Sequence, residues 1–291
     1  MQQASFTTRG RDLRGTLFQV AMLASLLLTL GILFALVTDV ALRASTVFAE
    51  RGLDFFGSPL SSNAKRAGIA QGLLGSGLLA ALVALIAFPL GVATAIYLEE
   101  YAGEGRLARF VQVNIRNLAG VPSVVYGLLG LAVFVPAFGR NAISGGVTLA
   151  VLVLPIVVIT ASEALRAVPR ALREAGYGVG ASPWEVTSRL VLPAAAPGIL
   201  TGTVLALARA LGETAPLVVA GAVLGSFSGT SLAKMLSGNY TALPVIIYDW
   251  SRRPQAAFRA DAAAAIIVLL VVVLAVSAIA ILLRRRFERE H

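Results

Sequence analysis

Arg209 and Glu213 are charged residues inside a long apolar stretch, and they are the residues of this chain best suited to bind an anion. They stand four positions apart in the run Arg-Ala-Leu-Gly-Glu-Thr-Ala-Pro, which also contains Thr214. Residues spaced by four lie on one face of a helix, so the two side chains are predicted to form an ion pair. A charge at the centre of a membrane span costs about 2.5–3.5 kcal/mol, so both side chains should face protein or water.

Two interpretations of this pair stay open. In one, it is an internal salt bridge that only neutralises two costly groups. In the other, this helix face lines a translocation path that includes Thr214, and the guanidinium of Arg209 donates hydrogen bonds to an oxyanion. Glu213 would then hold Arg209 in place when no anion is bound. Gly212 and Pro216 loosen the helix, as expected where a path opens and closes.

The residue inventory excludes most catalytic chemistry. The chain of 291 residues has no cysteine, and its one histidine is His291, so cysteine nucleophiles, thiolate metal sites and histidine triads are absent. Lys65 and Lys234 are its only lysines, and neither lies in the Gly-Lys-Ser/Thr context of a phosphate-binding P-loop. If this protein works with ATP, another chain must hydrolyse it.

A second polar segment, Arg173–Pro193, lies between two apolar stretches. Gly180 interrupts it, and Ser182-Pro183-Trp184-Glu185 follows. This pattern predicts a capping box, in which Ser182 accepts a hydrogen bond from a backbone N–H of the first turn and Glu185 reaches back, with proline at the first helical position. We expect two short helices joined by a glycine bend. Trp184 could lie at the lipid headgroups or contact a partner protein, and the glycine bend and helix beside it favour the partner.

The composition predicts the elements that position these residues. Charged residues make up 13% of the chain and hydrophobic ones 57%, against about 25% charged in an average soluble domain. A helix needs about 20 apolar residues to cross a bilayer. We therefore predict an all-α, polytopic membrane protein with about six spans, which are Leu17–Thr38, Ile69–Leu98, Leu118–Val135, Ile143–Ser162, Gly198–Leu224 and Ala262–Leu283.

The distribution of arginine predicts the orientation. Arginines are concentrated in the tails and short loops that share a side with the N-terminus, which places both termini and the polar segment in the cytoplasm. The net charge of +9 follows this membrane pattern and forms no aromatic-interleaved stripe, so we expect no nucleic-acid partner. The first apolar run is too long for a signal peptide and lacks a clear cleavage site, so it is expected to be a retained span.

The polar segment resembles the cytoplasmic loop of ABC-importer permeases. That loop has the pattern Glu-Ala-Ala, three residues, Gly, nine residues, Ile-x-Leu-Pro. Here Glu174-Ala175-Gly176, Gly180 and Leu190-Val191-Leu192-Pro193 stand at matching spacing, with Gly176 in place of the second alanine and Leu190 in place of isoleucine. The resemblance implies a loop that docks an ATPase through Glu174, Ala175, Gly180, Ser182, Pro183, Trp184, Glu185, Leu190 and Pro193.

Further runs are similar to the A-type permease of phosphate-specific ABC importers. They are residues 208–217, 118–127, 242–250, 89–92 and 97–101. This likeness implies a type I ABC importer permease fold in the inner membrane of a prokaryote. It also implies a second, related permease subunit, an ATPase dimer at the cytoplasmic face and an external phosphate-binding protein. No cofactor is expected in this chain, since ATP and Mg would be bound by the ATPase, and the chain would not be an enzyme.

The resulting domain organisation has three parts. Residues 1–68 comprise a cytoplasmic tail, the first span and an external loop. Residues 69–285 form the permease core, including a coupling loop at 163–196, which we call the polar loop, and residues 286–291 form a cytoplasmic tail. Alternatives are a permease for another oxyanion, such as sulfate or molybdate, and a self-sufficient secondary transporter or channel, for which the expected inverted repeats are missing. A purely structural scaffold would leave Arg209 and Glu213 without a purpose.

Overall fold

The computed structural model describes residues 13–103, 105–222 and 236–290, and every regular element in these ranges is a helix. The predicted N-terminal tail up to residue 12, the end of the predicted fifth span at residues 223–224 and the last residue of the predicted C-terminal tail lie outside these ranges. The all-α architecture predicted from the sequence is confirmed.

The helices follow one another with few long connections. The first half of the chain contains α1 (Leu13–Arg51), α2 (Asp54–Gly57), η1 (Ala64–Arg66), α3 (Ala70–Ile96), η2 (Tyr97–Tyr101), α4 (Arg106–Ala119), α5 (Ser123–Leu129), η3 (Gly130–Phe134) and α6 (Val135–Phe138). The second half contains α7 (Ala142–Arg166), α8 (Arg170–Gly178), α9 (Pro183–Val186), η4 (Thr187–Val191), α10 (Leu192–Gly212), α11 (Ala215–Val219), α13 (Leu243–Arg252) and α14 (Ala256–Glu290). η2, η3 and η4 are π-helical turns that continue the neighbouring α-helices.

Five helices in the described residues are long and apolar enough to cross a membrane, and a bent pair adds a sixth if it counts as one span. Four of the predicted spans, the first, second, fourth and sixth, correspond to α1, α3 with η2, α7 and α14, and the second predicted span begins one residue before α3, at its N-cap Ile69. The prediction of about six spans is therefore confirmed, although two of the predicted ranges are wrong.

The predicted third span, Leu118–Val135, straddles a sharp bend. α4 ends at Ala119, α5 begins at Ser123, and the helices on either side of the break meet at 104°. Gly120 and Pro122 explain the break, because proline disfavours helical conformation in the residue before it and glycine weakens a helix. The apolar run continues through a bend that its hydrophobicity does not reveal.

The predicted fifth span, Gly198–Leu224, is displaced towards the N-terminus. The helix runs from Pro183 through η4 and α10 to Gly212, and a separate short helix, α11, follows. Pro193 and Pro197 do not stop it. The π-helical turn η4 ends two residues before Pro193. The backbone there departs from regular α-helical hydrogen bonding, so a residue without an N–H is accommodated in the next turn.

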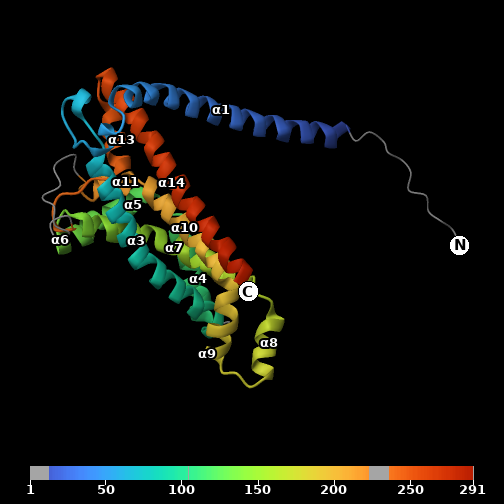
Figure 1. Cartoon of the computed structure of the whole chain (residues 1–291). Coiled ribbons are helices and arrows are strands. Elements are labelled where there is room, and N and C mark those ends of the chain that lie inside the picture. Colours follow the sequence, from blue (N-terminus) through green and yellow to red (C-terminus); the bar gives the residue numbers. More distant parts are fainter. Residues whose placement is uncertain (1–12, 104, 223–235, 291) are drawn as a thin grey trace.

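α3 and α7 form the centre of the molecule, with α10 packed against both and α14 against α10. Their contact forms an apolar core of aliphatic side chains that includes Leu79, Val83, Leu149 and Val153. A second core joins the end of α1 to α13 and α14, and a third lies under the polar loop. Figure 1 shows α8 and α9 at the end of the molecule opposite α13.

α1 lies largely outside this body. Its N-terminal part projects away from the other helices (Figure 1), and none of its most apolar 18-residue window is buried. Only its last turns join the second core, through Ala44 and Val47. An apolar helix with this exposure needs lipid or another protein chain around it.

The α3–α7 contact depends on Gly91, which gives the first prediction. A Cβ at Gly91 would lie 2.6 Å from Cγ1 and 2.9 Å from Cβ of Val157, whereas a Cβ at Gly77 on the same helix would meet nothing within 4 Å. Gly91→Ala should lower the stability by about 1–3 kcal/mol through overpacking, while Gly77→Ala should be neutral or slightly stabilising. Thermal unfolding of the two detergent-solubilised variants measures the difference, and equal melting temperatures would contradict the packing.

Candidate functional site

The polar loop is an ordered helical unit at one end of the molecule. α7 ends at Arg166, α8 follows from Arg170, and the chain then reverses at Gly180. Gly180 has a φ of +83°, a left-handed conformation that residues with a Cβ rarely adopt. The expected glycine bend is therefore present. The second helix of the predicted pair differs from expectation, because α9 is the first turn of the long helix that continues into α10.

The predicted capping box begins that helix. The hydroxyl Oγ of Ser182 accepts a hydrogen bond from the backbone N–H of Glu185 at 3.4 Å, and the Ser182 backbone N–H donates to Oε2 of Glu185 at 2.9 Å. Pro183 occupies the first helical turn. These contacts satisfy backbone donors that have no partner inside the helix, and they fix the direction in which α9 leaves the bend.

The polar loop exposes apolar side chains around the bend. Trp184 is 67% exposed and Val179 85%, and Tyr177 stands nearby on α8 with about half of its surface free. Glu174 and Ala175 are also exposed. An open groove with a volume of ≈ 520 Å³ lies beside them, lined by Glu99, Arg166, Arg170, Arg173, Glu174 and Tyr177. Large exposed apolar side chains beside a charged recess are typical of a protein-binding surface.

On its opposite side, the polar loop packs against the core beneath it, and Gly176 lies at this contact. A Cβ at this position would lie 2.8 Å from Cδ1 of Leu190 and 2.9 Å from Cγ2 of Val186. The glycine therefore allows α8 to approach η4 closely, and Leu190 is partly buried in the core beneath the loop. Pro193, in the first turn of α10, is half-buried. The residues of the sequence pattern thus divide into an exposed set and a packing set.

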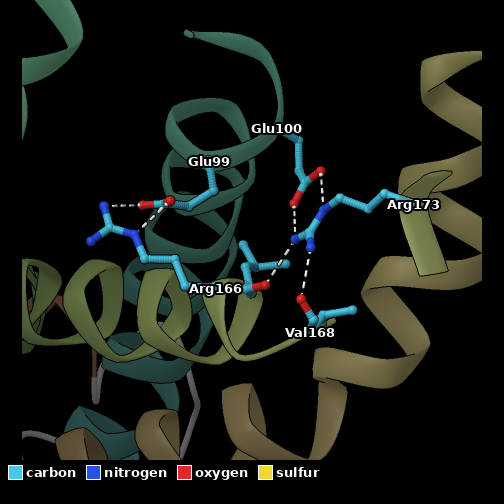
Figure 2. A network of polar contacts seen from close by, with 6 residues as sticks. Glu99, Glu100, Arg166, Val168 and Arg173 are labelled. Atoms are coloured by element: carbon cyan, nitrogen blue, oxygen red, sulfur yellow. Dashed lines mark hydrogen bonds and ion pairs between the residues drawn. The ribbon is translucent and has the colours of Figure 1, made fainter. Parts of the chain in front are cut away.

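Two ion pairs, which sequence reasoning missed, tie the polar loop region to the end of α3. In Figure 2, Glu99 and Glu100 of η2 each face one arginine. Arg166 donates from Nε and Nη2 to Glu99 at 2.7 and 2.8 Å. Arg173 donates from Nη2 and Nε to Glu100 at 2.7 and 3.2 Å. The two adjacent glutamates at the end of an apolar span could have indicated a site of ion pairing, but the sequence alone could not assign the arginines that pair with them.

Arg173 makes further contacts with α7 and the residues that follow it. Its Nη1 donates to the carbonyl oxygen of Val168 at 2.8 Å, and its Nη2 donates to that of Leu165 at 2.9 Å. The hydrogen bonds to the Glu100 carboxylate raise the pKa of the Arg173 guanidinium above its ordinary value, although burial opposes the shift. Arg173 therefore stays charged, and it stabilises carbonyl groups at a helix end that lack partners within the helix.

The structure brings Arg209 and Glu213 together at 3.4 Å between Nε and Oε1. Arg209 lies in the last turn of α10, and its side chain is 52% exposed, whereas that of Glu213 is 17% exposed. Glu213 itself is extended and stands outside the helix, so the expectation of one continuous helical face is wrong. Gly212 and Pro216 bound the break. Thr214 is the N-cap residue of α11, and its side chain makes no capping hydrogen bond.

The segment that follows the break after α10 is held in place by packing. A Cβ at Gly127 of α5 would lie 2.8 Å from Cα of Pro216, so α11 and α5 are in close contact. Arg209 thus projects from the end of α10, and the next helix, α11, is held against α5 of the bent pair. In the part of the chain that the structure describes, no group of three or more acidic, histidine or cysteine residues is placed to hold a metal ion.

Comparison with known families and proteins places these features in context. Residues 87–289 match the family described as binding-protein-dependent transport system inner membrane component. The chain is 38% identical over 192 residues to phosphate transport system permease protein PstA 1 of Mycobacterium tuberculosis, which is 65% of this chain and 62% of that protein. It is 32% identical over 210 residues to PstA of Xylella fastidiosa, covering 72% and 71% of the two chains. The chain thus spans about three fifths of the mycobacterial relative.

Solved structures share the fold at low sequence identity. A chain of a bacterial ABC transporter involved in the import of the acidic polysaccharide alginate superposes with a TM-score of 0.64 at 18% identity, over 94% of this chain and 96% of that one. A chain of the MetNI methionine ABC transporter gives a TM-score of 0.57 at 17% identity, over 76% and 94%. These structures confirm the predicted fold.

The capping box yields a local prediction. Ser182→Ala should destabilise the first turn of α9 by about 1 kcal/mol, because a backbone donor loses its acceptor. Ser188→Ala on the same helix is the control, since Ser188 only donates back to the carbonyl of Trp184. Hydrogen–deuterium exchange of residues 183–187 should become faster in the first variant and stay unchanged in the second. Equal exchange in both variants would mean that the box does not hold the bend.

Proposed function

We propose, on the premise that this chain belongs to the family of binding-protein-dependent transport system inner membrane components, that it is the permease subunit of an ATP-driven phosphate importer. It is a multi-pass inner-membrane transport component rather than an enzyme. Phosphate is the proposed substrate because curated relatives at 32–38% identity are named as phosphate permeases. The single observation that carries the proposal is the polar loop, which presents exposed aromatic and aliphatic side chains on a braced helical unit.

The polar loop is the proposed contact with a separate ATPase dimer. ATP, with Mg, would be bound by that partner, since this chain has no P-loop. Tyr177, Val179 and Trp184 supply apolar contact area, and the groove beside Glu174 supplies a charged recess. This arrangement has the apolar centre and polar surroundings of a specific interface. The loop lies in the cytoplasm in this proposal, and so do both chain termini.

A second permease subunit, related in sequence, would cover the exposed surfaces within the membrane. α1 exposes almost all of its apolar length, and Arg209 leaves half of its side chain uncovered. Lipid can cover α1 but not a guanidinium, whose cost in hydrocarbon is high. We therefore place Arg209 on the surface shared with the second permease, where the translocation path runs between the subunits. An external binding protein would deliver phosphate to this path.

Arg209 is the proposed phosphate contact in the path. Its distance of 3.4 Å from Glu213 is longer than that of the bidentate pairs at η2, and no close hydrogen bond joins the two side chains. A guanidinium held this loosely can exchange a carboxylate for an oxyanion, with similar charge-assisted hydrogen bonds in both states. The carboxylate of Glu213 then repels the departing anion. Thr214 offers a hydroxyl beside them.

The direct test is reconstitution. The chain is purified with its partner permease and ATPase, placed in proteoliposomes, and supplied with the binding protein and radioactive phosphate. ATP-dependent phosphate accumulation is expected, with little competition from sulfate or molybdate. Accumulation without ATP would indicate a secondary transporter, and preferential uptake of sulfate or molybdate would reassign the substrate.

Trp184→Asp tests the docking surface. Replacing an exposed apolar anchor with a charge should weaken ATPase binding by about tenfold or more, since central aromatic residues carry much of an interface's binding energy. Copurification and binding of the purified ATPase measure the effect. Tyr248→Asp is the control, because Tyr248 is 44% exposed on α13, at the other end of the molecule. Equal binding by both variants would contradict docking at the bend.

Arg209→Gln tests the path. Loss of charge-assisted hydrogen bonds to phosphate should lower the uptake rate by about ten- to hundredfold, while assembly with the ATPase persists. Arg43→Gln provides the control, because Arg43 forms an ion pair of the same i,i+4 spacing with Asp39 on the exposed helix α1. Unchanged uptake in Arg209→Gln would leave the pair as a neutralising salt bridge only.

A further inference from the structure

We propose that Arg173 is a positioning residue that transmits movement of the polar loop to the span formed by α3 and η2, through its ion pair with Glu100. This role rests on the proposed function, because it describes how ATP-driven movement entering at the loop would reach the translocation path. No part of the sequence pattern that identified the loop includes Glu100, which lies 73 positions before Arg173.

Three segments meet at the Arg173 guanidinium. The residue belongs to α8, its partner Glu100 belongs to η2, and the carbonyls of Leu165 and Val168 belong to the end of α7 and the residues beyond it. Figure 2 shows Glu100 and Val168 on opposite sides of the Arg173 guanidinium. A guanidinium with several donors in fixed directions holds such a junction in one geometry, which a lysine ammonium would not do.

The junction is shielded from solvent. The Arg173 side chain is 20% exposed and that of Glu100 is 5% exposed. Shielded, bidentate pairs resist screening by salt, and their two parallel hydrogen bonds restrain rotation as well as distance. A displacement of α8 must therefore either break this pair or move η2 with it.

The other connections of the loop explain why this pair matters. At its far end, the loop continues through α9 and η4 into α10, so movement reaches α10 along the backbone. α8 itself packs on α9 and η4, and its polar tie to η2 is the Arg173–Glu100 pair. Without that pair, the loop would still move α10, but α3 would no longer follow. Both α3 and α10 pack against α7, and in the proposed mechanism uptake requires the two helices to move together.

The neighbouring pair is a matched control. Arg166 bonds Glu99 in the same bidentate manner and in the same η2 turn, but Arg166 belongs to α7, and its side-chain hydrogen bonds in the described residues are to Glu99. Its side chain is also more exposed, at 46%. The two pairs differ in the feature under test, because the Arg166 pair joins α7 to η2, whereas the Arg173 pair joins α8 to η2.

The first experiment measures the phosphate transported per ATP hydrolysed by the reconstituted complex. Arg173→Met and Glu100→Gln should each lower this ratio by about fivefold or more, the range of a broken coupling between two sites, while ATP hydrolysis continues. Arg166→Met should keep the ratio near the wild-type value. Combining Arg173→Glu with Glu100→Arg should restore part of the ratio, because the ion pair is rebuilt without the bonds to the Leu165 and Val168 carbonyls.

A structural measurement separates transmission from simple loss of folding. The chain has no cysteine, so spin labels can be placed on Tyr97→Cys in η2 and Ala171→Cys in α8, two exposed positions outside the proposed docking surface. With Arg173 present, the distance between the labels should stay the same when ATP is added to the complex. In Arg173→Met, it should shift or broaden with ATP. If Arg173→Met does not assemble, the same distance is measured in Glu100→Gln, because glutamine has nearly the same shape as glutamate.

Three results would overturn the role of Arg173, and they are distinguishable. An unchanged transport ratio in both Arg173→Met and Glu100→Gln, in a complex whose wild type imports phosphate, would reject transmission through this pair and keep the proposed function. Absence of ATP-dependent phosphate uptake by the wild-type complex would reject the proposed function and this role together. An equal loss of coupling in Arg166→Met would also count against Arg173, because it would assign the effect to η2 as a whole.

Discussion

The close contact between α3 and α7 is the constraint on which the rest of the structure depends. Gly91 lets the helix backbones approach, and side chains such as Val157 fill the space that a larger residue would occupy. Within a bilayer, such packing replaces the hydrophobic effect as the source of helix association, so small residues at the contact decide the geometry. The contact fixes the positions of the ends of α3 and α7 relative to each other. Those ends carry Glu99 and Arg166, so the ion pairs of η2 form where the central packing places them.

The charged groups of the chain occupy two different kinds of environment. At η2 and the polar loop, glutamates and arginines pair at short distances, and the Arg173–Glu100 pair is the better shielded of the two. At the end of α10, Arg209 is paired more loosely and half of its side chain is exposed. The first arrangement suits a rigid structural connection, because breaking a shielded pair leaves an unpaired charge. The second suits exchange of ligands. The proposed coupling therefore depends on a short, shielded ion pair, whereas the proposed phosphate binding depends on a longer, exposed one.

Several features followed from the sequence because they depend on local chemistry. The capping box at Ser182 and Glu185, the bend at Gly180 and the ion pair of Arg209 with Glu213 each involve residues within a few positions of one another. The bounds of the third and fifth spans did not follow. Apolar composition continues through the break at Gly120 and Pro122, and the helix that begins at Pro183 continues through Pro193, where local rules predict a stop. Hydrophobicity records which residues avoid water, but not where the backbone turns.

The sequence by itself determined the all-helical membrane architecture, the absence of a P-loop motif from this chain and the position of the polar loop. Each of these rests on composition or on residues close together in the chain. Only the tertiary structure decided that Glu100 faces Arg173, that Gly176 is a packing residue beneath the loop, and that α11 turns away from α10 onto α5. These contacts join residues far apart in the sequence. The packing of the helices decides which residues meet. The periodicity within one helix does not specify which residue of another helix a given side chain will contact.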